Sequence, residues 1–362
     1  MSMLTSEIAN ERLLRQRISG EGLERPADVV RWMGAVQAQD YSGAKWALGL
    51  RTQTSTDADL EAAFATGAIL RTHVMRPTWH FIAPEDLHWM QALTSQRVCR
   101  QLSYQIRQLE LDSAVFKRTD RILEKALRDG QQLTRAELSS TIARAGIPTT
   151  GLRITHMLAR AELDALICSG GRRGKQFTYA LVAERAPYQR QLASDEALAE
   201  LTMRYFASHG PATSRDFAWW SGLPSADIKA GIDMVKSRLI CETIDGQEYR
   251  LMASAPAARL PRGAAHLLSN YDEYIVGYTD RSAVFDPIHA ADLDARHNPL
   301  FQHTIVSSGR IVGTWKRTAS MQSLGIQTKF FVEPRKAEVR ALGLASKRLA
   351  HFLQLQIADF RL

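Results

Sequence analysis

The sequence contains only three cysteines in 362 residues, and none of them forms a Cys-x-x-Cys pair. Their spacing excludes a zinc ribbon and a redox-active dithiol. The sequence also lacks a P-loop and a Gly-x-Gly-x-x-Gly turn, so no nucleotide cofactor is expected. No group of His, Cys, Asp and Glu has the spacing of metal ligands. We therefore expect a protein that needs neither a metal ion nor an organic cofactor.

Long hydrophobic runs are absent as well. No apolar stretch approaches the ~20 residues that cross a bilayer. The first residues lack the basic start and apolar run of a signal peptide, so we expect a cytoplasmic protein without a membrane partner. The 46 Lys and Arg exceed the 38 Asp and Glu, which gives a formal charge of +8. That balance favours a nucleic acid partner, although many soluble proteins are mildly basic.

One order of elements recurs along the chain: helices, then a two-stranded ribbon. Helical patterns fill most of the first 65 residues and lead into Ile69–Ile82, where β-forming residues lie on both sides of Arg76-Pro77. The order is that of a winged helix-turn-helix unit. It returns with a capping box at Thr134–Glu137, and again with a related box at Thr213–Asp216 followed by the hairpin signal Asp245-Gly246. The sequence therefore predicts three tandem units.

From His266 onwards, the sequence is dominated by strand patterns and not by helical ones. Short strands are predicted at Thr304–Ser307, Arg310–Lys316 and Lys329–Glu333, before a last helix at Leu344–Ile357. The predicted fold class is α+β, with three tandem winged helix-turn-helix units and a β-rich, barrel-like C-terminal domain. The expected domains are residues 1–112, 113–188, 189–256 and 257–362.

Near the start of the sequence, two glutamines are separated by a single residue. A helix is predicted from Pro26 to about Val36, followed by Gln37 and Gln39. If the chain leaves the helix near Ala38, alternation places both amides on one side. A pair of amides can orient a water or a sugar oxygen but cannot serve as a general base, because an amide does not titrate. Gln-x-Gln also occurs at two other places, so the motif alone favours a solvated or structurally bonded pair over a catalytic one.

Longer blocks distinguish these readings. The run Val36–Leu48 resembles the signature of the AlkZ/YcaQ family of bacterial DNA glycosylases, and Leu70–His80, Tyr271–Arg281 and Gly309–Arg317 are similar to further blocks of that family in the same order. The AlkZ branch is known by Gln-apolar-Gln and the YcaQ branch by Gln-apolar-Asp. The triplet beginning at Gln37 is therefore of the AlkZ type, while Asp40 follows one position later and would join the pair only if the backbone shifted.

The resemblance implies a monofunctional glycosylase that acts on bulky N7-alkylpurines and, in the AlkZ branch, on DNA interstrand crosslinks. Such a base already carries positive charge and departs easily. What remains is to place a water beneath C1′ and to stabilise an oxocarbenium-like sugar. Amide oxygens suit both roles, so Gln37 and Gln39 are the candidate catalytic residues. The expected partner is double-stranded DNA carrying alkylated purines, bound by a monomer in the bacterial nucleoid.

Basic residues in three places are candidates for DNA contact. They are the hairpin tip Arg172, Arg173 and Lys175, the tip of the first ribbon with Arg76 and His80, and Lys316 and Arg317 after Trp315. For the first and third groups, solvated surface is an equally good reading. His80, like His73, is more often a hydrogen-bonded structural residue than a catalyst.

Fold alone favours a second function, a non-catalytic DNA-binding protein such as a transcriptional regulator, because winged helices serve regulators more often than enzymes. No heptad run for dimerisation is present, which disfavours it. Crosslinked bases join both strands, so an enzyme for that lesion should present an open basic channel rather than a closed pocket. The sequence does not choose between a crosslink, a bulky monoadduct and a methyl group, or between general repair and antibiotic self-resistance.

Overall fold

Two units make up the chain in the computed structural model, which describes residues 5–253, 263–293, 296–320 and 322–361. The first unit comprises Met1–Leu60, Ala199–Trp220 and Ser225–Leu362, and the second comprises Glu61–Leu198 and Ser221–Pro224. The predicted boundary between residues 256 and 257 lies outside the described residues. The division into four domains is finer than these two units and stays a prediction.

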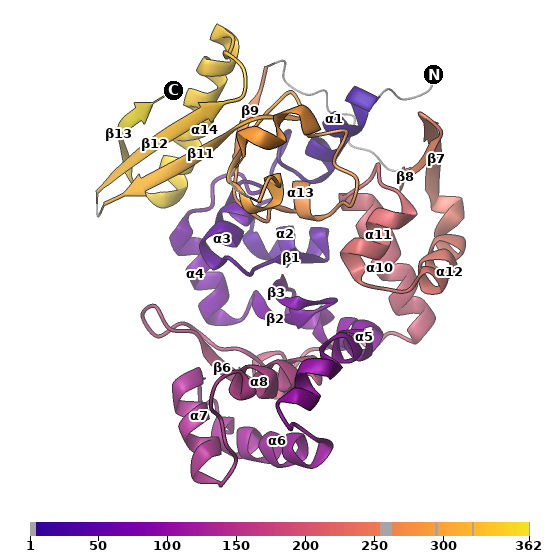
Figure 1. Ribbon diagram of the computed structural model, residues 1–362, viewed down its shortest axis with the longest axis vertical. Coiled ribbons are helices and arrows are strands. Elements are labelled where there is room, and N and C mark those ends of the chain that lie inside the picture. The colour runs from indigo at the N-terminus through magenta and orange to yellow at the C-terminus, as the bar shows by residue number, and fades with distance from the viewer. Residues whose placement is uncertain (1–4, 254–262, 294–295, 321, 362) are drawn as a thin grey trace. The chain divides into compact units, whose positions relative to one another are not determined.

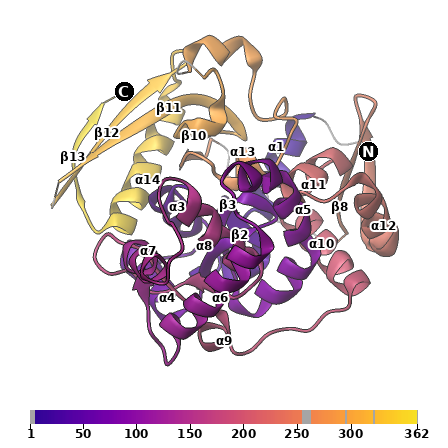
Figure 2. The same ribbon diagram turned by 60° about the horizontal axis from the view of Figure 1, so that its bottom comes forward.

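Three helices, which Figure 2 labels, and a small sheet form one half of the second unit. They are α6 (Ser113–Leu127), α7 (Arg135–Arg144), α8 (Arg153–Leu163), β4 (Leu133–Thr134), β5 (Ile167–Ser169) and β6 (Thr178–Leu181). The sheet order is β4-β6-β5, with antiparallel pairs. The predicted capping box opens α7, since Thr134 and Glu137 each bond the other's backbone N–H. Leucines and isoleucines of all three helices, such as Leu123, Leu138 and Ile154, share one core.

The first predicted ribbon also belongs to the second unit. Strand β2 (Leu70–Val74) pairs antiparallel with β3 (Arg76–Ile82) across a turn at Met75, whose φ is 61°. The rest of this half consists of the turn η1 (Pro84–Asp86), the long helix α5 (Leu87–Gln108) and the short helix α9 (Val182–Arg185). Helix α4 (Asp57–Thr66) begins in the first unit and ends in the second.

A second helical group with a hairpin lies mainly in the first unit. It consists of α10 (Ser194–Ser208), α11 (Ser214–Ser221), α12 (Ser225–Val235), the turn η2 (Lys236–Arg238), β7 (Leu239–Ile244) and β8 (Gln247–Met252). The box at Thr213 is complete although Asp216 is shorter than the usual Glu: the Asp216 carboxylate accepts from Thr213 N at 3.0 Å, and the Asp216 backbone N–H donates to Thr213 Oγ1 at 3.1 Å. Asp245 and Gly246 both have positive φ, as the predicted hairpin turn requires.

The N-terminal elements of the first unit are α1 (Thr5–Arg15), α2 (Pro26–Met33), β1 (Ala35–Gln37) and α3 (Tyr41–Gly49). Its C-terminal part contains α13 (Glu273–Val276), the turns η3 (Pro287–Asp292) and η4 (Pro299–Phe301), and a five-stranded sheet. The strands of that sheet are β9 (Ala265–Leu268), β10 (Thr304–Ser307), β11 (Arg310–Ala319), β12 (Ser323–Phe330) and β13 (Gln356–Arg361).

The prediction of a barrel-like domain is wrong. The sheet runs in the order β13-β12-β11-β10-β9, so β13 and β9 are free edges and the sheet does not close. It is mixed, because β13 lies parallel to β12 while the other neighbours are antiparallel. Helix α14 (Lys336–Leu353) packs against β9 and β13 (Figure 1). It begins eight residues before the predicted Leu344, and strand β13 was not predicted at all.

No helix within the described ranges is long and apolar enough to cross a membrane.

Candidate functional site

Gln37 ends a short strand, not a helix. Helix α2 stops at Met33 because Gly34 adopts φ 80°, a left-handed conformation that glycine tolerates. The predicted end at Val36 is therefore three residues too late, and Val36 lies in β1. Gln37, at 7% exposure, and Ala38, at 0%, are buried, whereas the next residue, Gln39, is exposed. The two amides thus have unequal surroundings, one almost buried and one open to solvent.

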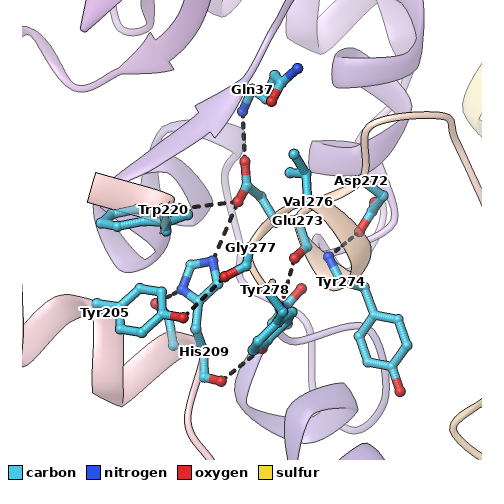
Figure 3. Close-up of polar contacts among 12 residues, drawn as sticks. Gln37, Tyr205, His209, Trp220, Asp272, Glu273, Tyr274, Val276, Gly277 and Tyr278 are labelled. Carbon is cyan, nitrogen blue, oxygen red and sulfur yellow. Dashed lines mark hydrogen bonds and ion pairs between the residues drawn. The ribbon is translucent and has the colours of Figure 1, made fainter. Parts of the chain in front are cut away.

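A carboxylate holds the backbone of Gln37 in place. The amide N–H of Gln37 donates to Oε1 of Glu273 at 2.7 Å, and the Gln37 side chain points away from that contact (Figure 3). Glu273 is fully buried and is the first residue of α13. A contact between residues 236 positions apart fixes where β1 ends, and with it the direction in which the Gln37 amide leaves the chain.

The other oxygen of Glu273 has donors of its own. Trp220 Nε1 donates to Oε2 at 3.1 Å, and His209 Nε2 lies 3.4 Å from the same atom (Figure 3). Burial lowers the pKa of His209, which favours the neutral ring at pH 7, although the neighbouring Glu273 acts in the opposite direction. A buried carboxylate is tolerated only when its lone pairs are satisfied, and here three N–H groups do so.

A second buried acid anchors α13 itself. Asp272 accepts from Tyr274 N at 2.9 Å as the N-cap of the helix, and receives both terminal nitrogens of Arg51 at 2.9 and 2.8 Å. The same guanidinium donates to Gln16 Oε1 at 2.7 Å, and Gln16 Nε2 donates to the Glu273 carbonyl at 3.3 Å. A bidentate, buried ion pair fixes position more strictly than a surface one. The two acids at residues 272 and 273 therefore position α13 and β1 together.

Close backbone packing completes this arrangement. A Cβ on Gly277 would lie 2.7 Å from the Glu273 carbonyl and 2.8 Å from His209 Cδ2. Tyr205 Oη donates to the Gly277 carbonyl at 3.0 Å, and Tyr278 Oη donates to the His209 carbonyl at 2.7 Å (Figure 3). These contacts give a structural role to the block Tyr271–Arg281, which was noted only for its resemblance. Through Glu273, this block contacts the backbone of Gln37 and holds it in position.

The surroundings of Gln39 are polar and partly open. Asp40 caps α3 by accepting from Gly43 N at 3.0 Å, so its carboxylate already has a role in the fold. Arg317 donates to Ser42 Oγ at 2.5 Å, which brings β11 to the start of α3. The ring of His303 lies nearby, and burial lowers its pKa, with Asp40 and Arg317 acting on it in opposite directions. The residues that follow Gln39, Asp40 and Ser42, thus have a cation and a largely neutral imidazole close to them.

Comparison with known proteins decides the family. A family model described as DNA glycosylase AlkZ-like matches residues 30–352. This chain belongs to the AlkZ-like DNA glycosylase family. Its members are hydrolases that act on glycosidic bonds in DNA, so DNA is the substrate that membership implies.

A curated relative and a solved structure agree with this family assignment. The chain is 24% identical over 322 residues to the interstrand DNA cross-link repair glycosylase of Streptomyces sahachiroi, covering 84% of this chain and 85% of the relative. The structure of Streptomyces sahachiroi DNA glycosylase AlkZ superposes with a TM-score of 0.79 at 21% identity, over the whole of both chains. At that identity the structural match establishes the shared α+β fold.

In this AlkZ-like chain, Arg76 and His80 form a local pair in the second unit. A carbonyl can only accept and a guanidinium can only donate. His80 Nδ1 lies 2.9 Å from the Thr78 carbonyl, and Arg76 Nη2 lies 3.2 Å from His80 Nε2. The ring is therefore a neutral Nδ1–H tautomer. His80 is fully buried, and His73 binds Glu162, so both rings are hydrogen-bonded parts of the ribbon.

The predicted basic tip contains three residues with different partners. Arg172 donates to Glu61 at 2.7 Å, and Arg173 donates to Glu137 and to the Gln132 carbonyl, both at 2.7 Å. Lys175 is exposed in the turn and lines a cavity. The two arginines are thus engaged within the protein, whereas Lys175 projects from it.

Lys316 and Arg317 lie within β11, which continues to Ala319, so the prediction that they end a strand is wrong. Lys316 is exposed, whereas Trp315 is buried and donates from Nε1 to the Leu268 carbonyl at 2.8 Å. Over the ranges that the structure describes, no three His, Cys, Asp or Glu side chains come together as metal ligands.

Sequence reasoning missed Glu273, Asp272 and Arg51. The available signal was the pair of acids at the start of α13. Apart from local bonds such as the N-cap of Asp272, the contacts that give these residues their roles join distant parts of the chain.

Proposed function

We propose that this protein hydrolyses the N-glycosidic bond of N7-alkylated purines in double-stranded DNA and leaves an abasic site. Bulky adducts and interstrand crosslinks are included, because the Streptomyces sahachiroi relative is named for crosslink repair. The observation that carries the proposal is the uncharged pair Gln37 and Gln39, on a backbone anchored by Glu273, in a chain of this family.

The amide of Gln37 acts by position. Its backbone is fixed by the 2.7 Å contact with Glu273 and its side chain is buried, at 7% exposure, so the amide loses little freedom when substrate binds. An amide oxygen held in this way directs its dipole towards the positive charge that develops on the sugar ring. The leaving base needs no acid, since alkylation at N7 has already made it cationic.

The amide of Gln39 is exposed and can reach a water from solvent. Its carbonyl oxygen accepts a hydrogen bond from the attacking water and orients it towards C1′. As the bond from C1′ to the base breaks and the water oxygen bonds to C1′, the proton that the water loses passes to solvent. Two nearby carboxylates do not replace the amides in this role. The oxygens of Glu273 accept three N–H donors in the interior, and Asp40 caps α3. The proposed chemistry therefore uses no general base.

For DNA contact, Lys175 and Lys316 are the leading candidates because both are exposed. Arg317, half-buried beside Ser42, is placed to contact a phosphate near Gln39. Arg76, His80, Arg172 and Arg173 act in this proposal mainly by shaping the two hairpins, since each has partners in the fold. The protein is proposed to act as a cytoplasmic monomer.

The test is single-turnover release of N7-methylguanine from alkylated duplex DNA, with unhooking of a crosslinked duplex measured in parallel. Gln37→Ala and Gln39→Ala should each lower the rate constant on the order of a hundredfold, the usual cost of one group that stabilises developing charge. Gln356→Ala, an exposed glutamine in another Gln-x-Gln, is the matched control and should leave the rate unchanged.

Retention of full activity by both glutamine variants would refute the assigned roles. Sequence-selective duplex binding without any base release would instead favour the transcriptional regulator. Family membership gives that second function no support.

A further inference from the structure

A cavity of about 580 Å³ opens in the second unit, and no residue of the candidate catalytic pair takes part in it. Its wall combines side chains of two kinds, cationic and aromatic. They are Arg71, Trp79, Arg135, Lys175, Phe177 and Tyr179. They come from the hairpin β2–β3, the start of α7 and the hairpin β5–β6, so three separate elements build the wall. Cavities of this size hold small organic molecules.

The side chains that carry charge in this wall are all basic. Arg71, Arg135 and Lys175 line the cavity, and no Asp or Glu is among the described residues that do so. Lys175 and Arg135 are exposed and can move their charge towards a ligand. Glu137, the nearest acid along the chain, is occupied by the capping box and by Arg173. The wall therefore favours an anion.

The aromatic rings give the cavity a flat platform. The Arg71 guanidinium lies 4.4 Å from the centroid of Trp79 and 4.5 Å from that of Phe177, so the cation is held between two ring faces. Arg71 is 8% exposed, and this packing leaves it little freedom. The faces of aromatic rings are surfaces on which nucleobases stack in proteins that bind unpaired strands, and Arg71 holds these two rings in place.

Hydroxyl and amide groups complete the set. Burial raises the pKa of Tyr179, so its hydroxyl stays protonated and can donate. Gln176 is exposed at the rim and offers both a donor and an acceptor. A simple inorganic anion would leave the aromatic faces unused, and a purely apolar ligand would make no use of the cationic side of the wall. A phosphate-bearing heterocycle matches both features.

We infer that this cavity binds a nucleotide, and specifically an unpaired nucleotide of the DNA strand. The base lies against Phe177, whose ring is held in place by Arg71, and Lys175 and Arg135 contact its phosphates. A free mononucleotide has the same chemistry. The strand is preferred because DNA is the substrate of this family. The inference goes beyond the proposed reaction, because it concerns binding of undamaged DNA.

The probe is a duplex with one bulged 2-aminopurine, compared with the same duplex without the bulge and with dAMP. Stacking quenches 2-aminopurine. We expect saturable quenching by the full-length protein and about tenfold tighter binding of the bulged duplex than of the intact one. Lys175→Ala and Phe177→Leu should each remove most of that preference. Lys117→Ala changes an exposed lysine of the same unit that does not line the cavity, and should retain the preference.

Equal binding of bulged and intact duplexes overturns the inference, as does a Lys175→Ala variant that weakens both duplexes equally. Saturable binding of dAMP without preference for the bulge would overturn the assignment to DNA. Because Lys175 is exposed, its loss does not threaten folding, and a melting curve checks Phe177→Leu. Gln37→Ala should quench normally, so this test can fail or succeed independently of the proposed catalysis.

Discussion

Charged side chains occur both around α13 in the first unit and in the cavity of the second unit. Those around α13 are buried and hydrogen-bonded within the protein, whereas two of those in the cavity are exposed. Around α13, Glu273 and Asp272 are fully buried and bound by donors of the same unit. In the cavity, Arg135 and Lys175 face an open space with no acid in its described wall. Charges satisfied internally hold the backbone in place, whereas charges without an internal counterion are available to a ligand.

The largest effect is expected from Glu273→Ala. It leaves the Gln37 N–H and the Trp220 indole N–H without an acceptor in the interior, which should lower the free energy of unfolding by about 3 kcal/mol or more. Glu273→Gln keeps one oxygen and should lose less. Urea unfolding of both variants checks this, and Glu124→Gln, on an exposed helix face, should stay close to wild type.

The excision rate of Glu273→Gln separates positioning from stability. A folded variant with a reduced rate constant and unchanged DNA affinity would show that Glu273 acts through Gln37. If Glu273→Ala had the same free energy of unfolding as wild type, the hydrogen bonds of Glu273 would not be needed to hold β1. The proposed difference between the two regions would then be wrong.

A smaller loss is expected from Gly277→Ala. The added Cβ would meet the Glu273 carbonyl and His209 at under 3 Å, which should cost about 2 kcal/mol. Gly343→Ala is the matched control in α14, where a Cβ meets nothing within 4 Å; alanine there should stabilise by up to about 1 kcal/mol. Thermal melting of the two variants should give shifts of opposite sign. Equal shifts would mean that the packing at Gly277 is not tight.

Acid should weaken the first unit through its buried imidazoles. Burial, with Arg348 and Arg51 nearby, lowers the pKa of His266 to about 4. The unfolded chain binds this proton near pH 6.5 and the folded chain does not, so stability is complete above pH 6.5 and falls as the pH drops towards 4. Between pH 7.5 and 5 this residue alone should cost about 2 kcal/mol.

The measurement is urea unfolding at the two pH values for wild type and His266→Asn. The drop should be smaller in the variant, whatever its stability at pH 7.5. An identical drop would show that His266 titrates normally in the fold.

The smallest effect on stability belongs to the cavity. Lys175→Ala should change the free energy of unfolding by no more than about 0.5 kcal/mol, because the side chain is exposed. The same variant should lose the preference for bulged DNA. A large destabilisation would place Lys175 in the fold rather than at a ligand site.

Local signals explain most of what could be predicted. The turn at Asp245-Gly246 and the capping box at Thr134 depend on residues within four positions, and the structure has both. Strand β13 was missed because it pairs in parallel with β12 across the whole of α14. The end of α2 was misplaced although Gly34 was visible as a breaker.

The site follows the same rule. Gln37 and Gln39 could be singled out from a short motif, whereas the role of Glu273 depends on a contact across more than two hundred residues. The unequal exposure of the two amides also depends on how the chain packs. The sequence indicates the chemistry of the two amides. It does not indicate the long-range contacts, such as that of Glu273 with the Gln37 backbone, that hold them in position.

The most direct test of the central claim is the pH dependence of single-turnover N7-methylguanine release between about pH 6 and 8.5. Because Gln37 and Gln39 do not titrate, the rate constant should be flat across this range. A sigmoidal rise with a single pKa in that interval would reveal a general base and would contradict hydrolysis by two uncharged amides.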